Sequence, residues 1–355
     1  MQLPAHGANA HALYKAMNMM MPQEVIDVSE NVNVDGIPQS ITEHWPRLIH
    51  KLPNYPDELA EPFYSTIANF HQVPKSELLV TNGAAEGLMA LAQFFREEDV
   101  ALLEPSFSEY KRTLKQQNCT IHSIVAEDIV DYKFNEDELY QVLSSVKVLY
   151  ICNPNNPTGV LLKKDWIEKL LQTHPHCYFV IDEAFMDWTD EKESIISLVP
   201  TYPNLFVLRS MTKMFALAGV RLGYIMGQHV EKLRGFLPHW SVSAIAIELG
   251  TICLGEQKFV SQSREKSAKL RKKMTLDIEA LGCTITNSSV NFLLFKLPDQ
   301  IEPDEFFSNL LRRGIVLRHT KNYVGLDGKW FRIAVKNEEI WDKCKKEITD
   351  YVKNY

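Results

Sequence analysis

The 355-residue chain has no apolar stretch near the ~18 residues that a membrane-spanning helix needs. Its six cysteines are scattered, with no Cys-x-x-Cys pair and no metal-binding spacing, so we expect reduced thiols and no metal site. The formal net charge of −7 leaves no general basic surface for nucleic acid. The first residues lack the basic and apolar regions of a signal peptide. These absences predict a cytoplasmic protein without a membrane or nucleic-acid partner.

Apolar residues make up 45% of the sequence, and their spacing indicates the fold class. Between about residues 83 and 240, short apolar runs alternate with helical stretches, which predicts an α/β fold with a mostly parallel central sheet flanked by helices. The expected strands are 78–81, 100–103, 148–152, 179–182, 205–208 and 222–226.

The pattern changes near residue 241, where a smaller α+β region is expected to begin. A long charged helix over about 257–281 precedes strand-like runs at 291–296 and 331–335, a helical segment at 304–313 and a terminal helix from about 337. We therefore expect three parts: an N-terminal arm (1–30) that packs with the small domain, a large α/β domain (31–240) and a small C-terminal domain (241–355).

The most informative motif is Ser210-Met211-Thr212-Lys213, followed by Ala218 to Tyr224. A lysine amine can form an imine with an aldehyde, while the hydroxyls of Ser210 and Thr212 and the guanidinium of Arg221 can hold a phosphate dianion. Taken alone, such a lysine is usually a solvated surface residue. The combination indicates an enzyme that uses pyridoxal phosphate (PLP).

Three further segments lie at expected strand ends or helix starts, where ligands gather. Asp182 ends an apolar strand and can face the pyridine nitrogen, although a strand-end Asp may also cap a helix. Asn156, between two prolines, can donate to the cofactor phenolate, although such a heptad can also be only a turn. Gly83, Ala84 and Ala85 begin a helix whose free N–H groups can bind phosphate, although most glycines before helices are plain turns.

Together these motifs resemble those of fold-type I PLP enzymes of the class I/II aminotransferase group, over nearly the whole chain. The motifs are Asn153 to Gly159, Asp182 to Phe185, and Ser210 to Lys213 with Gly219 to Tyr224. Within the group the sequence is similar to histidinol-phosphate aminotransferases and, more closely, to threonine-phosphate decarboxylases.

The resemblance implies roles for three more residues. Tyr110 falls where the family stacks an aromatic ring on the cofactor, and it otherwise would be a core or rim residue. Tyr55 matches the tyrosine that reaches the cofactor phosphate of the neighbouring subunit, so a homodimer with shared active sites is implied. Arg332 matches the arginine that grips the substrate α-carboxylate, although an arginine on a strand may simply face solvent.

The N-terminus and the region around residue 318 favour the decarboxylases. The openings His6 to Asn9 and Asp27 to Asn33 resemble theirs, which implies substrate-binding roles for His6 and Asn33. Arg318 is expected to bind the substrate phosphate, with His6 as a possible partner. Departures from the family occur at residues 33–36, at Ala84-Ala85, and at Phe185, where aminotransferases commonly have a tyrosine.

The expected function is decarboxylation of O-phospho-L-threonine to 1-amino-2-propanol phosphate, with Lys213, Asp182 and Tyr110 as catalytic residues. Transamination of histidinol phosphate or another amino acid with 2-oxoglutarate remains an alternative, because PLP enzymes break whichever Cα bond stands perpendicular to the ring. A PLP-binding regulator without turnover is a second alternative, disfavoured because Lys213, Asp182 and Arg332 are all present.

Overall fold

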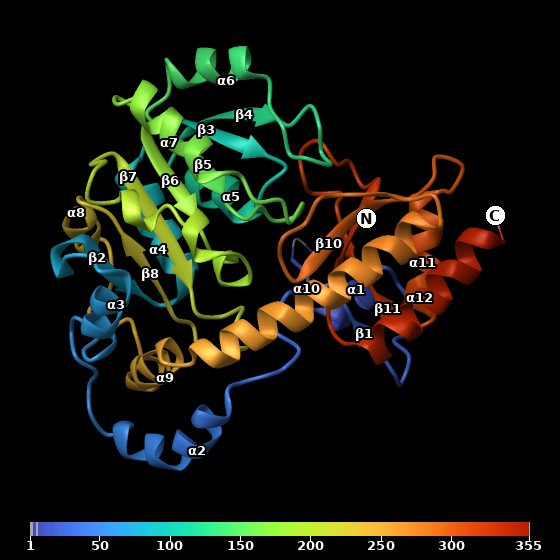
Figure 1. Ribbon diagram of the computed structural model, residues 1–355, viewed down its shortest axis with the longest axis horizontal. Helices are drawn as coiled ribbons and strands as arrows, with labels where there is room; N and C mark the ends of the chain where they lie inside the picture. Colours follow the sequence, from blue (N-terminus) through green and yellow to red (C-terminus); the bar gives the residue numbers. More distant parts are fainter. Residues whose placement is uncertain (1–2, 5, 355) are drawn as a thin grey trace.

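The computed structural model describes residues 3–4 and 6–354, which form two lobes joined by the long helix α10 (Gln257–Glu279). Figure 1 shows this helix running from beside α9 of the larger lobe across to α11 and α12 of the smaller one. The expected long charged helix is therefore confirmed, and it connects the two halves of the molecule.

A seven-stranded sheet forms the centre of the larger lobe, in the order β2-β8-β7-β6-β5-β3-β4. Strands β3 to β7 run parallel, and β8 pairs antiparallel with both β2 and β7. The strands are β2 (Leu78–Thr81), β3 (Asp99–Glu104), β4 (Thr120–Val125), β5 (Val148–Cys152), β6 (Tyr178–Asp182), β7 (Leu205–Ser210) and β8 (Gly223–Met226). All six expected strands are present, and β4 was not foreseen. The α/β prediction is confirmed.

Both faces of this sheet are covered by helices, which explains why its strands are almost entirely apolar. In β5, Leu149 and Ile151 pack into one hydrophobic core, whereas Val148 and Tyr150 pack into another on the opposite face. The covering helices are α3 (Phe63–His71), α4 (Gly83–Phe94), α5 (Ser108–Gln116), α6 (Glu136–Leu143), α7 (Lys164–Thr173), α8 (Val230–Arg234) and α9 (Ala244–Leu254), and α2 (Gln39–Leu48) packs against α9.

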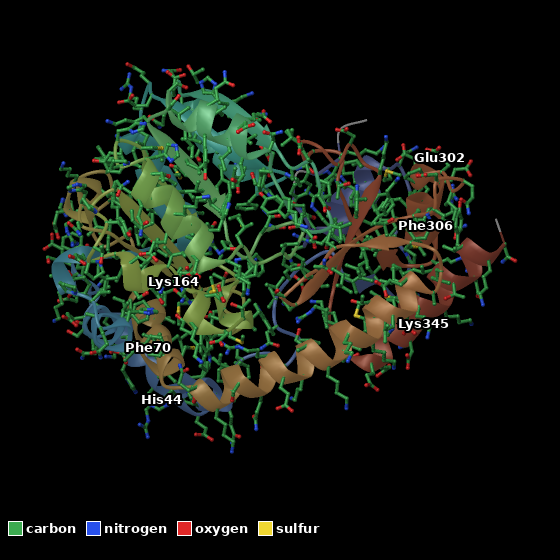
Figure 2. All side chains as sticks on the ribbon, turned by 45° about the horizontal axis from the view of Figure 1, so that its top comes forward. His44, Phe70, Lys164, Glu302, Phe306 and Lys345 are labelled. Carbon is green, nitrogen blue, oxygen red and sulfur yellow. The ribbon has the colours of Figure 1, made fainter. Side chains whose placement is uncertain are left out.

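The smaller lobe is built on an antiparallel sheet in the order β12-β13-β10-β9, with helices packed against it. Its interior includes Phe306, which contacts Phe331 with ring centroids 5.3 Å apart and is labelled in Figure 2. The elements are β9 (Thr284–Ile285), β10 (Phe292–Lys296), α11 (Pro303–Arg312), β11 (Ile315–Val316), β12 (Arg318–His319), β13 (Trp330–Ala334) and α12 (Glu338–Lys353).

The N-terminal segment belongs to the smaller lobe, as expected. Strand β1 (Ile26–Asp27) pairs parallel with β11, and Leu13 and Tyr14 of α1 (Ala10–Ala16) are buried in the small core. The expected domain break at 240/241 needs correction, because α9 and Val260 pack into the larger core. By packing, the change of lobe falls within α10, whose residues from Leu270 onward join the small core.

All six cysteines are buried and free of disulfides. Within residues 3–4 and 6–354, no helix combines the length and the apolar character needed to cross a bilayer. The cytoplasmic location stays a prediction.

Candidate active site

A cavity of about 290 Å³ lies between the two lobes, at the carboxyl ends of β5, β6 and β7. Parallel strands bring their carboxyl ends to one edge, so residues distant in sequence meet there. Eleven of the residues expected from the sequence line this cavity: His6, Ala84, Ala85, Asn156, Asp182, Ser210, Thr212, Lys213, Arg221, Arg318 and Arg332.

Lys213 follows β7, and its amine points into the cavity 5.8 Å from the centre of the Phe185 ring. Burial, together with the positive charges of Arg332 and Arg221, lowers the pKa of this amine to about 8. Part of the Lys213 population is therefore neutral near physiological pH, and a neutral amine can act as a nucleophile or accept a proton.

Asp182 ends β6 and is held by two donors. The Tyr110 hydroxyl donates to its Oδ2 at 2.7 Å, and the Ala184 N–H donates to its Oδ1 at 3.0 Å. Burial raises the pKa of Asp182, whereas these hydrogen bonds and the charge of Lys213 act to lower it. The carboxylate is thus fixed in one orientation on the cavity wall.

A cradle for an anion is formed where α4 begins. The N-cap residue Asn82 offers no side-chain cap, so the N–H groups of the first turn remain open to a ligand. Gly83 has φ +75°, and a Cβ added there would lie 2.8 Å from Nη2 of Arg221. The guanidinium of Arg221 therefore lies directly over this turn, and the glycine is required for both reasons.

The hydroxyls of Ser210 and Thr212 complete the cradle. They lie 2.8 Å apart, hydrogen-bonded to each other, and both line the cavity. Hydroxyl donors, open backbone N–H groups and a guanidinium are the groups that bind phosphate in proteins.

Two arginines form the opposite wall, and they are direct neighbours on adjacent strands. Arg318 of β12 pairs in register with Arg332 of β13, and both are buried, with exposures of 2% and 5%. Burial, with the nearby charge of Arg318, lowers the pKa of Arg332 to about 10, so it stays charged at neutral pH. Like charges directly opposite each other destabilise a sheet. The pair is thus an energetic cost that bound anions would offset.

The protein satisfies only part of the Arg332 guanidinium. Its Nη1 donates to Oδ1 of Asn156, and its Nη2 donates to the carbonyl of Ser29 at 2.6 Å. The buried Nε has no partner among the described residues. A buried donor left unpaired is costly, which indicates that a ligand oxygen belongs there.

His6 reaches the cavity from the N-terminal segment. Its Nε2 lies 2.8 Å from Oε1 of Glu109, and its ring lies 5.8 Å from that of Phe107. The placement of His6 on the same cavity as Arg318 agrees with the expected partnership.

Three expected residues lie elsewhere. Tyr110 is fully buried beneath the site and donates to Asp182, whereas Phe107 lines the cavity; the stacking of Tyr110 on the cofactor stays a prediction. Asn33 lines a different cavity, and its amide donates to the carbonyl of Met214 at 2.9 Å; it positions the chain beside Lys213 instead of facing substrate. Tyr55 is 82% exposed and stands against Trp240, away from this cavity.

Sequence reasoning missed several lining residues, including Phe107, Glu30, Asn31 and Tyr323. A usable signal existed for Phe107, since it is the turn residue between β3 and α5, whereas Tyr110 is already inside the helix. Glu30 and Asn31 belong to the same motif as the expected Asn33, but this segment is not a strand beyond Asp27, so no periodic pattern could have shown which of its side chains face the cavity.

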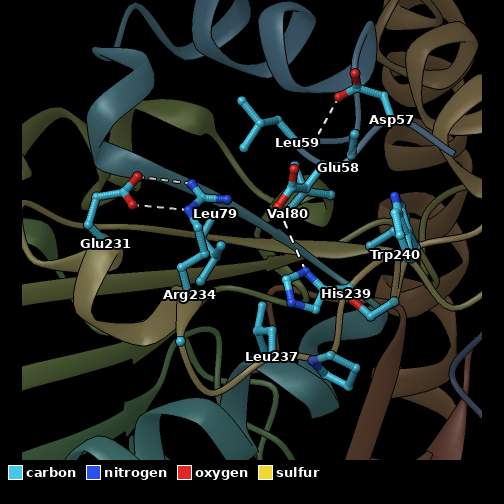
Figure 3. A pocket seen from close by; sticks show the side chains of 15 residues that line it. Asp57, Glu58, Leu59, Leu79, Val80, Glu231, Arg234, Leu237, His239 and Trp240 are labelled. Atoms are coloured by element: carbon cyan, nitrogen blue, oxygen red, sulfur yellow. Dashed lines mark hydrogen bonds and ion pairs between the residues drawn. The ribbon is translucent and has the colours of Figure 1, made fainter.

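A larger cavity of about 350 Å³, drawn in Figure 3, contains none of the expected site residues. Arg234 pairs with Glu231 at 3.0 Å and His239 lies 3.8 Å from Glu58, while Oδ1 of Asp57 accepts from the N–H of Leu59 at 2.9 Å. Among the residues that the structure describes, this lining contains no lysine, so it lacks the amine found in the first cavity.

A lysine, a strand-end carboxylate and a phosphate cradle on this α/β fold define the class of PLP-dependent enzymes. The chain belongs to the aminotransferase class I and II family, which matches residues 23–344.

Relatives carry two different activities in their names. Threonine-phosphate decarboxylase of Salmonella typhimurium is 27% identical over 342 residues, covering 94% of this chain and 92% of that protein. Histidinol-phosphate aminotransferase of Methanococcus aeolicus is 26% identical, covering 88% and 86%. The solved structure of the histidinol-phosphate aminotransferase from Clostridium acetobutylicum has a TM-score of 0.87 at 26% identity, covering 92% of this chain and 99% of that one.

The cofactor is PLP. The Sinorhizobium meliloti histidinol-phosphate aminotransferase, solved in complex with pyridoxal-5'-phosphate, shares the fold, with a TM-score of 0.84 at 16% identity and coverage of 97% of this chain and 94% of that one. The cavity fits this group: the Gly83 turn, Ser210, Thr212 and Arg221 would hold its phosphate, Asp182 its ring nitrogen and Lys213 its aldehyde carbon.

Proposed function

We propose that this protein decarboxylates O-phospho-L-threonine to 1-amino-2-propanol phosphate. The observation that carries the proposal is the buried pair Arg318 and Arg332, set opposite each other on β12 and β13 and facing the cavity that contains Lys213. Two fixed cations beyond the cofactor cradle suit a substrate with two separate anionic groups. Phosphothreonine has a carboxylate and a phosphate, whereas histidinol phosphate has only the phosphate.

Arg332 is the better placed of the two for the carboxylate. Its unpartnered Nε supplies one donor, and its contact with Asn156 connects it to the strand ends that surround Lys213. Arg318 then takes the phosphate: its guanidinium lies 5.1 Å from the Tyr323 ring centre and is held by the Asn322 side chain at 2.8 Å. His6 lines the same cavity and would supply a further polar contact at that end.

The remaining roles follow from the site's own side chains. When bound, PLP withdraws electrons from the substrate Cα and so stabilises the charge left after CO₂ departs. Asp182, held by Tyr110 and Ala184, would present its carboxylate to the ring nitrogen. Lys213, with its pKa lowered to about 8, can carry the proton that Cα takes up. Phe185 offers no hydroxyl, so the Asn156 amide, which lines the same cavity, would be the donor to the cofactor phenolate.

The test compares two substrates with the same enzyme. Purified enzyme is given O-phospho-L-threonine while CO₂ is measured and, separately, histidinol phosphate with 2-oxoglutarate while glutamate is measured. CO₂ from the first mixture without glutamate from the second supports the proposal. Glutamate from the second mixture without CO₂ from the first contradicts it and indicates an aminotransferase.

We also propose that the protein works as a homodimer in which Tyr55 reaches the cofactor phosphate of the other subunit. In support, Tyr55 is 82% exposed in the single chain, and large apolar side chains surround its part of the surface. These are Trp45, Ile49, Leu52, Leu59 and Trp240, each at least 41% exposed. Light scattering should give twice the chain mass, and Tyr55→Phe should weaken PLP binding without changing that mass. A monomer with full activity would contradict the proposal.

A further inference from the structure

A second cavity, of about 250 Å³, lies at the junction of the two lobes, outside the active site. The segment that departs from the family pattern, Val34-Asp35, forms one side of it. The middle of α10 and the chain after β13 form the others, and Trp188 closes it from the larger lobe. Its lining therefore comes from both lobes, which α10 connects (Figure 1).

Two buried donors on the cavity wall have no partner within the described part of the chain. Nε1 of Trp188 and Oγ of Ser267 are both shielded from solvent, in residues with exposures of 4% and 9%. An indole N–H can only donate, so the missing partner must present an acceptor atom. Buried polar groups are nearly always satisfied, and each exception needs an explanation.

The charges around these donors favour an anion. Lys266, Lys269 and Lys336 line the cavity, against Asp35 and Glu338. Lys266 lies 3.2 Å from Asp35, whereas Lys269 has no ion pair among residues 3–4 and 6–354. Lys336 lies 3.4 Å from Glu30, so Lys269 supplies the cation of this lining with which an anion can pair directly.

We propose that this cavity is a binding site for a small oxyanion, either phosphate or a short dicarboxylate. Its volume lies below the ~300 Å³ at which pockets for drug-sized ligands begin, so a compact anion fits better than a nucleotide. Trp188 and Ser267 donate to its oxygens, and Lys269 and Lys336 balance its charge.

The site is connected to the active site through two contacts. Lys336 lies 3.4 Å from Glu30, which lines the active-site cavity. Asn33, on the wall of the second cavity, has its backbone N–H donating to the carbonyl of Lys213 at 3.0 Å. An anion beside Lys336 competes with Glu30 for that ammonium group and braces the two lobes against each other.

Calorimetric titration of the holoenzyme, freed of excess cofactor, tests the proposal with phosphate in one arm and succinate in the other. The expected result is binding of at least one of these anions that becomes at least tenfold weaker in Trp188→Phe and in Lys269→Gln. The matched control is Lys272→Gln, on the same helix but outside the cavity, which should leave affinity unchanged. The arm with the tighter binding identifies the anion.

The active site can also bind these anions, so Arg318→Gln is titrated in parallel. Binding that disappears in Arg318→Gln and is unchanged in Trp188→Phe and Lys269→Gln overturns the proposal, as does no binding of either anion. Lys269 is exposed, so its variant keeps the test decisive even where Trp188→Phe folds poorly. Binding is measured without turnover, so a wrong substrate assignment above leaves this test intact.

Discussion

Replacing Tyr110 with phenylalanine removes one hydroxyl and leaves the ring that fills the space beneath the active site. That hydroxyl donates to Asp182 at 2.7 Å, and both residues are buried. A hydrogen bond to a charged group contributes about 1.5–3 kcal/mol to stability, so the free energy of unfolding should fall by that amount. Urea denaturation of the holoenzyme measures the change.

The neighbouring Tyr150 offers a matched control. Its ring centre lies 5.8 Å from that of Tyr110, and its hydroxyl is buried without a partner among the described residues. Tyr150→Phe therefore removes an unpaired hydroxyl and should leave stability unchanged or slightly increase it. If the two variants lose the same stability, the hydrogen bond to Asp182 does not have the strength assigned to it.

The same replacement changes the pH dependence. The Tyr110 hydroxyl stabilises the charged form of Asp182, so its loss raises the pKa of that carboxyl further. Since Asp182 is charged only above its pKa, the acidic limb of kcat/KM should move to higher pH. A limb that stays in place or moves to lower pH refutes this argument.

Further predictions concern the two ends of the site. Gly83→Ala should weaken PLP binding, because an L side chain at φ +75° costs ~1–2 kcal/mol and its Cβ displaces Arg221. The control is Gly219→Ala, which lies in open space without a strained φ and should leave PLP binding unchanged. Cofactor titration measures both. Arg318→Gln removes one charge-assisted contact to the substrate, so kcat/KM for phosphothreonine should fall by about 10- to 150-fold, mostly through a higher KM. An unchanged KM would mean that the phosphate binds elsewhere. In cofactor-free protein, the rate at which Lys213 captures PLP should rise with pH and level off above about 8, since only the neutral amine reacts; a rate still rising at much higher pH would contradict the lowered pKa.

The sequence predicted the larger lobe well because its sheet is buried on both faces. Strands covered on both sides need continuous apolar runs, and those runs ended within two residues of the observed bounds. Strand β4 was missed because it is an edge strand with several polar residues (Thr120, His122 and Ser123), and only Ile124 of its six residues is buried. Its pairing depends on β3, and single-strand patterns carry no information on partners.

The sequence identified those site residues whose motif lies at the end of a strand. It did not identify those for which the packing of the folded chain decides which side chain faces the cavity. Lys213, Asp182 and Asn156 all follow buried strands and all line the cavity. Tyr110 and Phe107 are three residues apart, and only the start of α5 at Ser108 determines which ring faces the cavity. The Arg318–Arg332 register could not be foreseen, because β12 has only two residues.

The way α10 is shared between the two hydrophobic cores limits how the lobes can move. Val260 near its start is held by one core, and Met274 and Ile278 near its end are held by the other. Neither end can slide without exposing apolar surface, so closure of one lobe over the other is confined to bending about the stretch between them. Ser263 and Ser267 occupy that stretch, so we expect any bending of α10 to occur there.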